Sequence, residues 1–218
     1  MAFRAEVRRA LSQSVGSSLA QAFAAPKVTV IVADAAVSER DVVALSELVE
    51  SLVRVGTSRG RCMLLLAHAG PEAPAPALKS HAKLLRATLG MPVVVHDSTE
   101  RSDWIPGAIE ALGECSLDDE LREAEAVVLV GRWSRRKDGA PHGGPALLLP
   151  GLADAAMHVR WAACPDREAR DAAMRAVTAI VPVDYALLWD ASDPPHVRAG
   201  SGAELFAALE AEGWPRTE

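Results

Sequence analysis

The chain has 218 residues, of which 50% are hydrophobic and 24% are charged, and its formal net charge at pH 7 is −6. These values are typical of a globular protein with a sizeable core, and they exclude disorder over most of the length. The acidic balance argues against a nucleic-acid-binding protein, and no stretch approaches the roughly 18 to 20 apolar residues of a membrane span.

The cysteines and the N-terminal residues indicate the compartment. Cys62, Cys115 and Cys164 are odd in number and widely spaced, so neither a disulfide framework nor a structural zinc site is expected. The N-terminal residues MAFRAEVRRALSQ carry charges where a signal peptide has its apolar segment. We therefore expect a cytoplasmic protein.

Helix and strand signals alternate through the first half of the chain. Two short helical segments precede a buried strand that ends at Asp34, and Ser38 is placed to cap the helix that follows. A second strand ends at His68, and a third ends at His96 and Asp97. In chain order the predicted segments are helices 3–13 and 17–25, strand 27–33, helix 39–55, strand 61–67, helix 78–89 and strand 91–95.

The second half begins with a long connection over 98–119. A fourth apolar strand ends at Gly131, and the loop 131–145 after it is rich in glycine and charge. Prolines 194 and 195 interrupt the last connection. The predicted segments are strand 124–130, helix 166–180, strand 183–189 and helix 202–212.

Buried strands that alternate with helices predict a parallel sheet covered on both faces. The expected fold is therefore α/β, a three-layer sandwich with a mostly parallel, Rossmann-like sheet. We expect a single domain over 1–218, with its core at about 10–212.

Ligands of open parallel sheets bind beyond the carboxyl ends of the strands. Asp34 and His68 follow strands at this edge, and the loop 131–145 should cover it. Backbone N–H groups of Gly143 and Gly144 could approach an anion closely, or the two glycines form only a surface turn. The loop is neither a Walker loop nor a G-x-G-x-x-G fingerprint.

His68 and His142 are the candidates for proton transfer or metal ligation at this edge, and the alternative is that both are structural. His96 is expected to bridge loops. Arg136, with its neighbours Arg135 and Lys137, could neutralise a carboxylate or phosphate, or could form a solvated face of the loop. The sequence contains no Ser/His/Asp arrangement of a hydrolase and no H-E-x-x-H pattern.

Residues 10–212 resemble the N-terminal domain of the nickel-dependent lactate racemase family. The resemblance is carried in order by LSQSVGSSLAQAF, by KVTVIVADAAVSERD at the family's D-x-T-R-P motif, by CMLLLAHAGPE at G-T-H-R-P, and by VVVHDSTE at N-H-D. It continues in EAEAVVLVGRWSRRKDGAPHGGPALLLPGLADA, which matches the strand and the Gly-Gly-x-Lys loop, and in CPDREARDAAMRAVTAIVPVDYALLW. It implies the same fold for this chain.

That family uses a nickel pincer nucleotide, tethered to a lysine, to remove and return a hydride at an α-hydroxy acid. The tethering Lys falls on Ala146 and a nickel-ligand His falls on Ala162. No cofactor is therefore expected, because alanine can neither form the thioamide link nor bind a metal.

Other positions of the family's site are changed or kept. The Arg of the first motif falls on Val37, one His falls on Gly70 and another falls on Arg136. Asp34 persists, as do the pairs Gly143-Gly144 and Pro150-Gly151. The resemblance implies that the scaffold is retained and that the nickel chemistry is lost.

The leading hypothesis is therefore a racemase-like pseudoenzyme that binds a small anionic metabolite or a partner subunit at the carboxyl edge of the sheet. The partner subunit could be a second copy of the same chain, in a homo-oligomer. Trp133, among arginines, could be a contact residue or could pack on its own loop. The alternative is a metal-independent isomerase, lyase or cyclase of an oxygenated acid, with His68 and His142 as acid and base and Arg136 on the carboxylate. A third possibility is one half of a racemase whose other residues come from a second polypeptide. It is disfavoured because the tethering lysine would have to lie on this half, where the residue is Ala146.

Overall fold

The computed structural model describes residues 2–25, 27–68, 70–100, 102–110, 112–135, 141–164, 166–214 and 216–217. Within this part of the chain, no helix combines the length and the apolar character that a membrane crossing needs.

A six-stranded sheet forms the middle of the molecule, with the strand order β10-β9-β6-β1-β2-β3. Neighbouring strands are parallel except β10, which runs antiparallel to β9. This arrangement confirms the predicted α/β fold with a mostly parallel sheet. The strands are β1 (Thr29–Asp34), β2 (Cys62–Ala67), β3 (Val93–Val95), β6 (Ala126–Arg132), β9 (Tyr185–Trp189) and β10 (Val197–Gly200).

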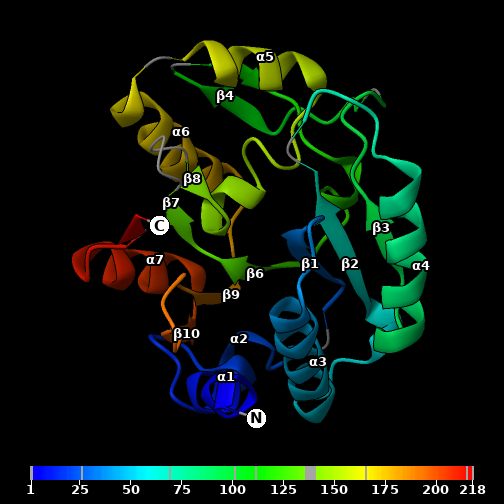
Figure 1. Ribbon diagram of the computed structural model, residues 1–218, viewed down its shortest axis with the longest axis vertical. Helices are drawn as coiled ribbons and strands as arrows, with labels where there is room; N and C mark the ends of the chain where they lie inside the picture. The colour runs from blue at the N-terminus through cyan, green and yellow to red at the C-terminus, as the bar shows by residue number, and fades with distance from the viewer. Residues whose placement is uncertain are drawn as a thin grey trace.

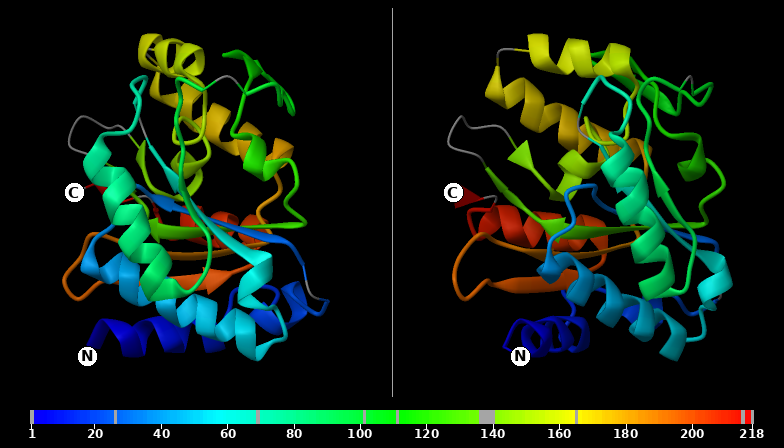
Figure 2. Two further views of the ribbon diagram at one scale, coloured as in Figure 1. Left: turned by 90° about the vertical axis from the view of Figure 1, so that its right-hand side faces the viewer. Right: turned by 45° about the vertical axis from the view of Figure 1, so that its right-hand side comes forward.

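Helices cover both faces of the sheet (Figure 1). On one face lie α1 (Ala2–Ser12), α2 (Leu19–Ala22), α3 (Glu39–Arg54) and α4 (Pro76–Leu89). On the other lie α6 (Arg167–Ile180), α7 (Gly202–Ala211) and the short helix η3 (Gly144–Leu147). The turned views in Figure 2 show the sheet between these layers, with α5 (Ala155–Ala163) beyond its edge.

Alternate side chains of each strand enter different halves of the core. Val30 and Val32 of β1 pack with α6 and α7, whereas Ile31 and Ala33 pack with α3 and α4. All four are at most 2% exposed. Because both faces are covered, the strands are continuously apolar instead of alternating, which is why they are recognisable in the sequence.

The strand order reverses between β1 and β6. The chain proceeds from β1 to β2 and β3 on one side and then returns to β6 on the other side of β1. The connection after β1 leads to α3 on one face, and the connection after β6 leads to η3 on the opposite face. Such a reversal leaves a crevice beyond the carboxyl ends of the two strands, where α/β proteins bind their ligands.

Several elements were absent from the sequence prediction. The long connection after β3 contains a small antiparallel hairpin and a helical turn, and the strand β10 and helix α5 were also missed. The remaining short elements are η1 (Arg59–Arg61), β4 (Gly107–Ile109), β5 (Gly113–Cys115), η2 (Asp119–Leu121), β7 (Ser134–Arg135), β8 (Pro141–His142) and β11 (Arg216–Thr217).

Trp133 is a core residue. Its side chain is 2% exposed, and its ring packs edge-to-face on Phe206 with a centroid distance of 5.6 Å. The suggestion that Trp133 is a surface contact is therefore wrong, because the indole fills the space between the sheet and α7.

Candidate functional site

Two cavities lie at the carboxyl edge of the sheet, beside the crevice between β1 and β6. The first, the switch-point cavity, has a volume of about 370 Å³. Its lining residues are Asp34, Ala36, Ser38, Glu39, Arg40, Asp41, Gly131, Arg132, His142, Gly143, Leu147 and Trp189. The second, the alanine cavity, has a volume of about 440 Å³. Its lining residues are Asp34, Ala67, Gly70, Pro71, His142, Gly143, Ala146, Leu147, Pro150, Gly151, His158, Val159, Trp161 and Ala162.

Four residues line both cavities, and two of them, Asp34 and His142, can form an ion pair when the imidazole is protonated. His142 Nδ1 lies 3.8 Å from Asp34 Oδ2. The other oxygen, Asp34 Oδ1, accepts a hydrogen bond of 2.7 Å from Ala36 N, which fixes the carboxylate at the end of β1. With Gly143 and Leu147, this pair makes a common wall. The structure therefore brings together Asp34, His142 and Gly143 as the sequence predicts.

The N-terminus of α3 forms one side of the switch-point cavity. Ser38 caps this helix as predicted, in a reciprocal box with Asp41: Ser38 N donates to Asp41 Oδ2 over 2.7 Å. Burial raises the pKa of the Asp41 carboxyl against the opposing effect of its hydrogen bonds with Ser38. Arg40, in the first turn of α3, and Arg132, at the end of β6, also line the cavity. The cavity therefore holds both carboxylate and guanidinium groups.

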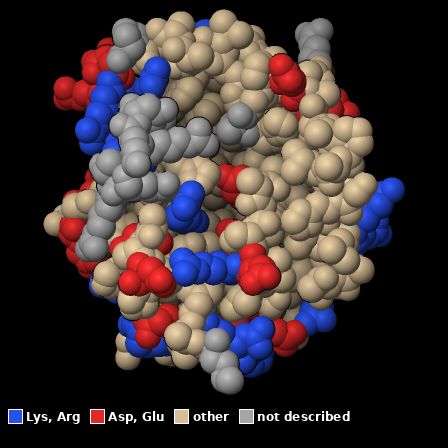
Figure 3. All heavy atoms as spheres, in the orientation of Figure 1, with Lys and Arg blue, Asp and Glu red and all other residues tan. Residues whose placement is uncertain are grey.

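The space-filling view shows charged side chains of both signs around a hollow near the middle of the face (Figure 3). Few charged side chains are visible directly to the right of this hollow. This face of the molecule thus has charged groups near its centre and an uncharged area beside them.

The glycine turn, residues 142–144, depends on its glycines for steric reasons. Gly143 has φ +68°, and a Cβ there would lie 1.4 Å from Arg132 O. Gly144 has φ +55°, and its Cβ would lie 2.7 Å from the Trp133 ring. Both residues are thus required by the turn itself. Gly143 also lines both cavities, whereas Gly144 is not among the described residues that line either one.

The alanine cavity contains both positions at which the family resemblance places cofactor-binding groups. Ala146 and Ala162 lie on η3 and α5 and line the same cavity. Neither methyl group is a nucleophile or a metal ligand. Among the described residues, no group of three or more His, Cys, Asp and Glu side chains lies close enough together to hold a metal ion. The described residues therefore do not fit a lysine-tethered nickel cofactor.

His158 is a further residue of the alanine cavity, and the sequence analysis missed it. It is 8% exposed, and its Nε2 is buried without a hydrogen-bond partner. Burial, with smaller effects of His96 and His68, lowers the pKa of His158 to about 4. The imidazole is therefore neutral near pH 7. Because His158 precedes Ala162 by four residues, the two lie on the same face of α5.

His68 does not join His142. His68 is not among the described residues that line either cavity. Its ring lies against Gly70, and burial, with His96 nearby, lowers its pKa. The geometry required for an acid–base pair of these two histidines at one cavity is thus not present.

His96 bridges loops, as expected. Its Nδ1 lies 2.6 Å from Asp118 Oδ2, and its Nε2 lies 2.9 Å from Ala153 O. Burial lowers the pKa of His96, but the hydrogen bonds with Asp118 and Ala153 raise it by more than burial lowers it. The pKa of His96 is therefore above its ordinary value. The bridge ties the end of β3 to the segment that precedes α5.

Of the basic loop residues proposed as an anion site, Arg136 lies outside the described residues. Arg135 is 6% exposed and donates to Asp171 Oδ2 of α6 over 2.7 Å. It lies outside both cavities, whereas Arg132, which the sequence analysis did not select, lines the switch-point cavity.

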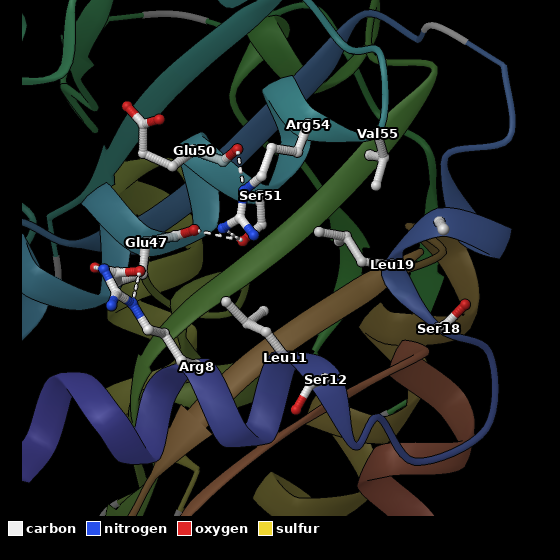
Figure 4. Close-up of a pocket in the computed structure, with 11 residues that line it drawn as sticks. Arg8, Leu11, Ser12, Ser18, Leu19, Glu47, Glu50, Ser51, Arg54 and Val55 are labelled. Atoms are coloured by element: carbon white, nitrogen blue, oxygen red, sulfur yellow. Dashed lines mark hydrogen bonds and ion pairs between the residues drawn. The ribbon is translucent and has the colours of Figure 1, made fainter.

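A larger cavity of about 630 Å³ lies between α1, α2 and the C-terminal half of α3 (Figure 4). Its arginines are engaged within the protein: Arg8 Nε donates to Glu47 Oε2 over 2.7 Å, and Arg54 Nη2 donates to Ser51 Oγ over 2.9 Å. Because α3 runs opposite to the strands, this cavity lies near their amino ends. The carboxyl-edge cavities are therefore the better candidate site.

The sequence matches no family model and none of the curated proteins. The fold matches the structure of the lactate racemase apoprotein from Thermoanaerobacterium thermosaccharolyticum with a TM-score of 0.75 and 16% identity, over 94% of this chain and 54% of that one. It also matches the crystal structure of a protein from Thermotoga maritima with a TM-score of 0.60 and 13% identity, over 96% and 56% of the two chains.

The chain therefore spans about half the length of each of these two proteins. At such identities the likeness shows a shared fold, and it is consistent with the resemblance to a racemase N-terminal domain.

Proposed function

We propose that this lactate racemase-like domain has lost lysine-tethered nickel chemistry and binds a small anionic ligand at the carboxyl edge of its sheet. One observation carries the proposal: Ala146 and Ala162 line the same cavity as Asp34 and His142. The cavity is present, and the two alanines supply neither the amine nor the imidazole that the family resemblance would place there.

Several groups support an anionic ligand in the switch-point cavity. Arg40 and Arg132 supply guanidinium groups, which can bind a carboxylate through two parallel hydrogen bonds. Arg40 Nη2 lies 3.5 Å from the exposed carboxylate of Asp193, a weak surface pair that a bound anion would replace. The N-terminus of α3, a helix of 16 residues, adds the positive end of its dipole. Asp34 and Asp41 are already engaged, one by Ala36 N and His142 and the other by Ser38.

The loss of nickel chemistry is tested by the intact mass under native and denaturing conditions, with metal analysis of the same sample. We expect the mass of the bare chain and no stoichiometric nickel. A covalent adduct of nucleotide size with one nickel per chain would overturn this part of the proposal. A partner subunit at the same edge, or a second copy of this chain, would be detected as a larger native mass.

Ligand binding is tested by calorimetry with lactate, pyruvate and inorganic phosphate. We expect Arg40→Gln to weaken binding of the carboxylates by about tenfold, as for the loss of one charge-assisted hydrogen bond. Arg86→Gln is the matched control, because Arg86 is an exposed helical arginine on α4, away from both cavities. No binding of any of the three anions at millimolar concentrations would refute the ligand.

A second candidate function is a metal-independent isomerase, lyase or cyclase of an oxygenated carboxylic acid. The proximity of Asp34 and His142 favours it, since an imidazole at the cavity wall can transfer a proton and a carboxylate 3.8 Å away stabilises its protonated form. Its test is hydrogen–deuterium exchange at the carbon next to the carboxylate of 2-hydroxy acids, followed by NMR. Exchange that disappears in His142→Gln would support the enzyme, and a complete lack of exchange would leave the binding function.

A further inference from the structure

The two cavities of the site differ in the chemistry of their walls. The switch-point cavity is lined by charged side chains, among them Arg40, Arg132 and Glu39. The alanine cavity is lined mainly by small or apolar side chains, such as Ala146, Ala162 and Trp161. A molecule that suits one cavity therefore does not suit the other.

The cavities are nevertheless neighbours. Asp34, His142, Gly143 and Leu147 contribute to both, so the two spaces meet at this common wall. One molecule that reaches across this wall would have one end in each cavity.

His158 adds an uncharged imidazole to the wall of the alanine cavity. It lines this cavity although it is only 8% exposed, and burial lowers its pKa to about 4. The ring is therefore neutral near pH 7 and adds no positive charge to the wall. This wall suits an uncharged group better than a second anion.

We propose that the ligand has two parts: a carboxylate head in the switch-point cavity and an uncharged, mainly apolar body of about six or more carbon atoms in the alanine cavity. This inference rests on the proposed function and specifies its ligand class. The volume is sufficient, because an apolar cavity of about 150 Å³ is enough to hold benzene, and the alanine cavity measures about 440 Å³.

The size of the body has a measurable effect on affinity. A fully buried methylene group strengthens binding by about fourfold, so partial burial of several methylenes should amount to at least tenfold. We therefore compare 2-hydroxyoctanoate with lactate, which has the same head but only a methyl group. Octane-1,2-diol, which has a similar chain but no charge, reports on the contribution of the head.

A pair of substitutions tests where the body binds. Ala162 and its neighbour Ala163 are both exposed on α5, but only Ala162 is among the described residues that line the alanine cavity. Ala162→Phe should reduce the preference for 2-hydroxyoctanoate over lactate by at least about fivefold, because the ring takes up space in the cavity. Ala163→Phe adds the same side chain one position away and should retain the preference.

The outcomes separate the two proposals. A preference of about tenfold or more for 2-hydroxyoctanoate, reduced only by Ala162→Phe, supports the two-part ligand. Equal affinity for lactate and 2-hydroxyoctanoate overturns the two-part ligand and leaves the anion-binding function intact. Equal affinity for the diol and the acid removes the role of the carboxylate and overturns both, as does failure of every probe to bind.

Discussion

His158 combines burial with an unsatisfied nitrogen, and its titration reports directly on the alanine cavity. Its pKa of about 4 lies below the value of 6.5 that is ordinary for histidine. The unfolded chain therefore takes up a proton at this residue at a higher pH than the folded chain does. It follows that His158 lowers the stability of the fold progressively as the pH falls from about 6.5 toward 4.

We expect the His158 ring signals in NMR spectra to show a neutral imidazole down to about pH 5. Replacement by leucine (His158→Leu) should reduce the loss of unfolding free energy between pH 7 and pH 5 by about 1–2 kcal/mol relative to the unchanged chain. Urea unfolding at the two pH values measures this difference. A folded-state pKa near 6.5 would contradict the expectation.

The three thiols differ in their surroundings. Cys62 and Cys115 are buried, and burial raises the pKa of each to about 11. Cys164 is half-buried at the end of α5. Since the thiolate is the reactive form, we expect one fast-reacting thiol in the native protein at pH 8 and three after unfolding in urea, counted with a chromogenic disulfide reagent. Cys164→Ser should remove the fast phase, and a fast phase that persists would show that a buried cysteine is accessible.

The role of a single residue is easier to predict from the sequence when it depends on residues nearby in the chain than when it depends on distant contacts. Ser38 was identified as a cap because its partner Asp41 is three residues away. The involvement of His158 was missed because it depends on α5 lining the same cavity as η3. For Arg135 an anion-binding role and a solvated loop face were both considered, because its partner Asp171 is 36 residues distant in the chain.

The glycine turn is the element that closes the common wall of the two cavities. Gly143→Ala should lower the unfolding free energy by about 3 kcal/mol or more, because the new Cβ would overlap the carbonyl oxygen of Arg132. Gly213→Ala is the matched control: Gly213 also has a positive φ, of +82°, but its Cβ would meet nothing within 4 Å. The control should cost about 1 kcal/mol, which is the backbone contribution alone. Equal losses in urea unfolding would refute the steric account.

Element by element, the predicted strands are found because a strand buried on both faces is a short apolar run. β10 was not predicted, since its four residues, VRAG, include a charge and a glycine and gain their stability from pairing with β9. α5 was also missed, although Asp154 accepts a hydrogen bond from Met157 N at its start. That cap, followed by Ala155 and Ala156, was the signal available in the sequence.

In the whole molecule, α1 packs beneath β9 and β10 as part of the core. Val7 is fully buried, whereas Ala5 lies on the exposed face of the same helix. Val7→Asp should lower the unfolding free energy by about 3 kcal/mol or more, because it buries an unpaired charge. Ala5→Asp introduces the same charge and should change it by no more than about 0.5 kcal/mol. Similar midpoints for the two variants in thermal unfolding would show that α1 is not integral to the fold.

The general architecture follows from alternating apolar runs and helices, but the position of the site follows from strand order. The sequence places Asp34 and the loop 131–145 at strand ends. It does not show that β6 returns beside β1, and this adjacency brings Asp34 to His142. The volumes of the two cavities depend in addition on η3 and α5, so they could not be predicted from strand ends alone.

The steric demand of the glycine turn affects which residues change as related chains diverge in evolution. Selection for a correctly folded turn keeps Gly143 and Gly144 in place even when no molecule is bound there. Ala146, in contrast, has no positive φ, and its 7% exposed side chain is limited only by its neighbours in the packing. During divergence the two glycines would therefore persist for folding alone, whereas position 146 could exchange among side chains that the packing accepts.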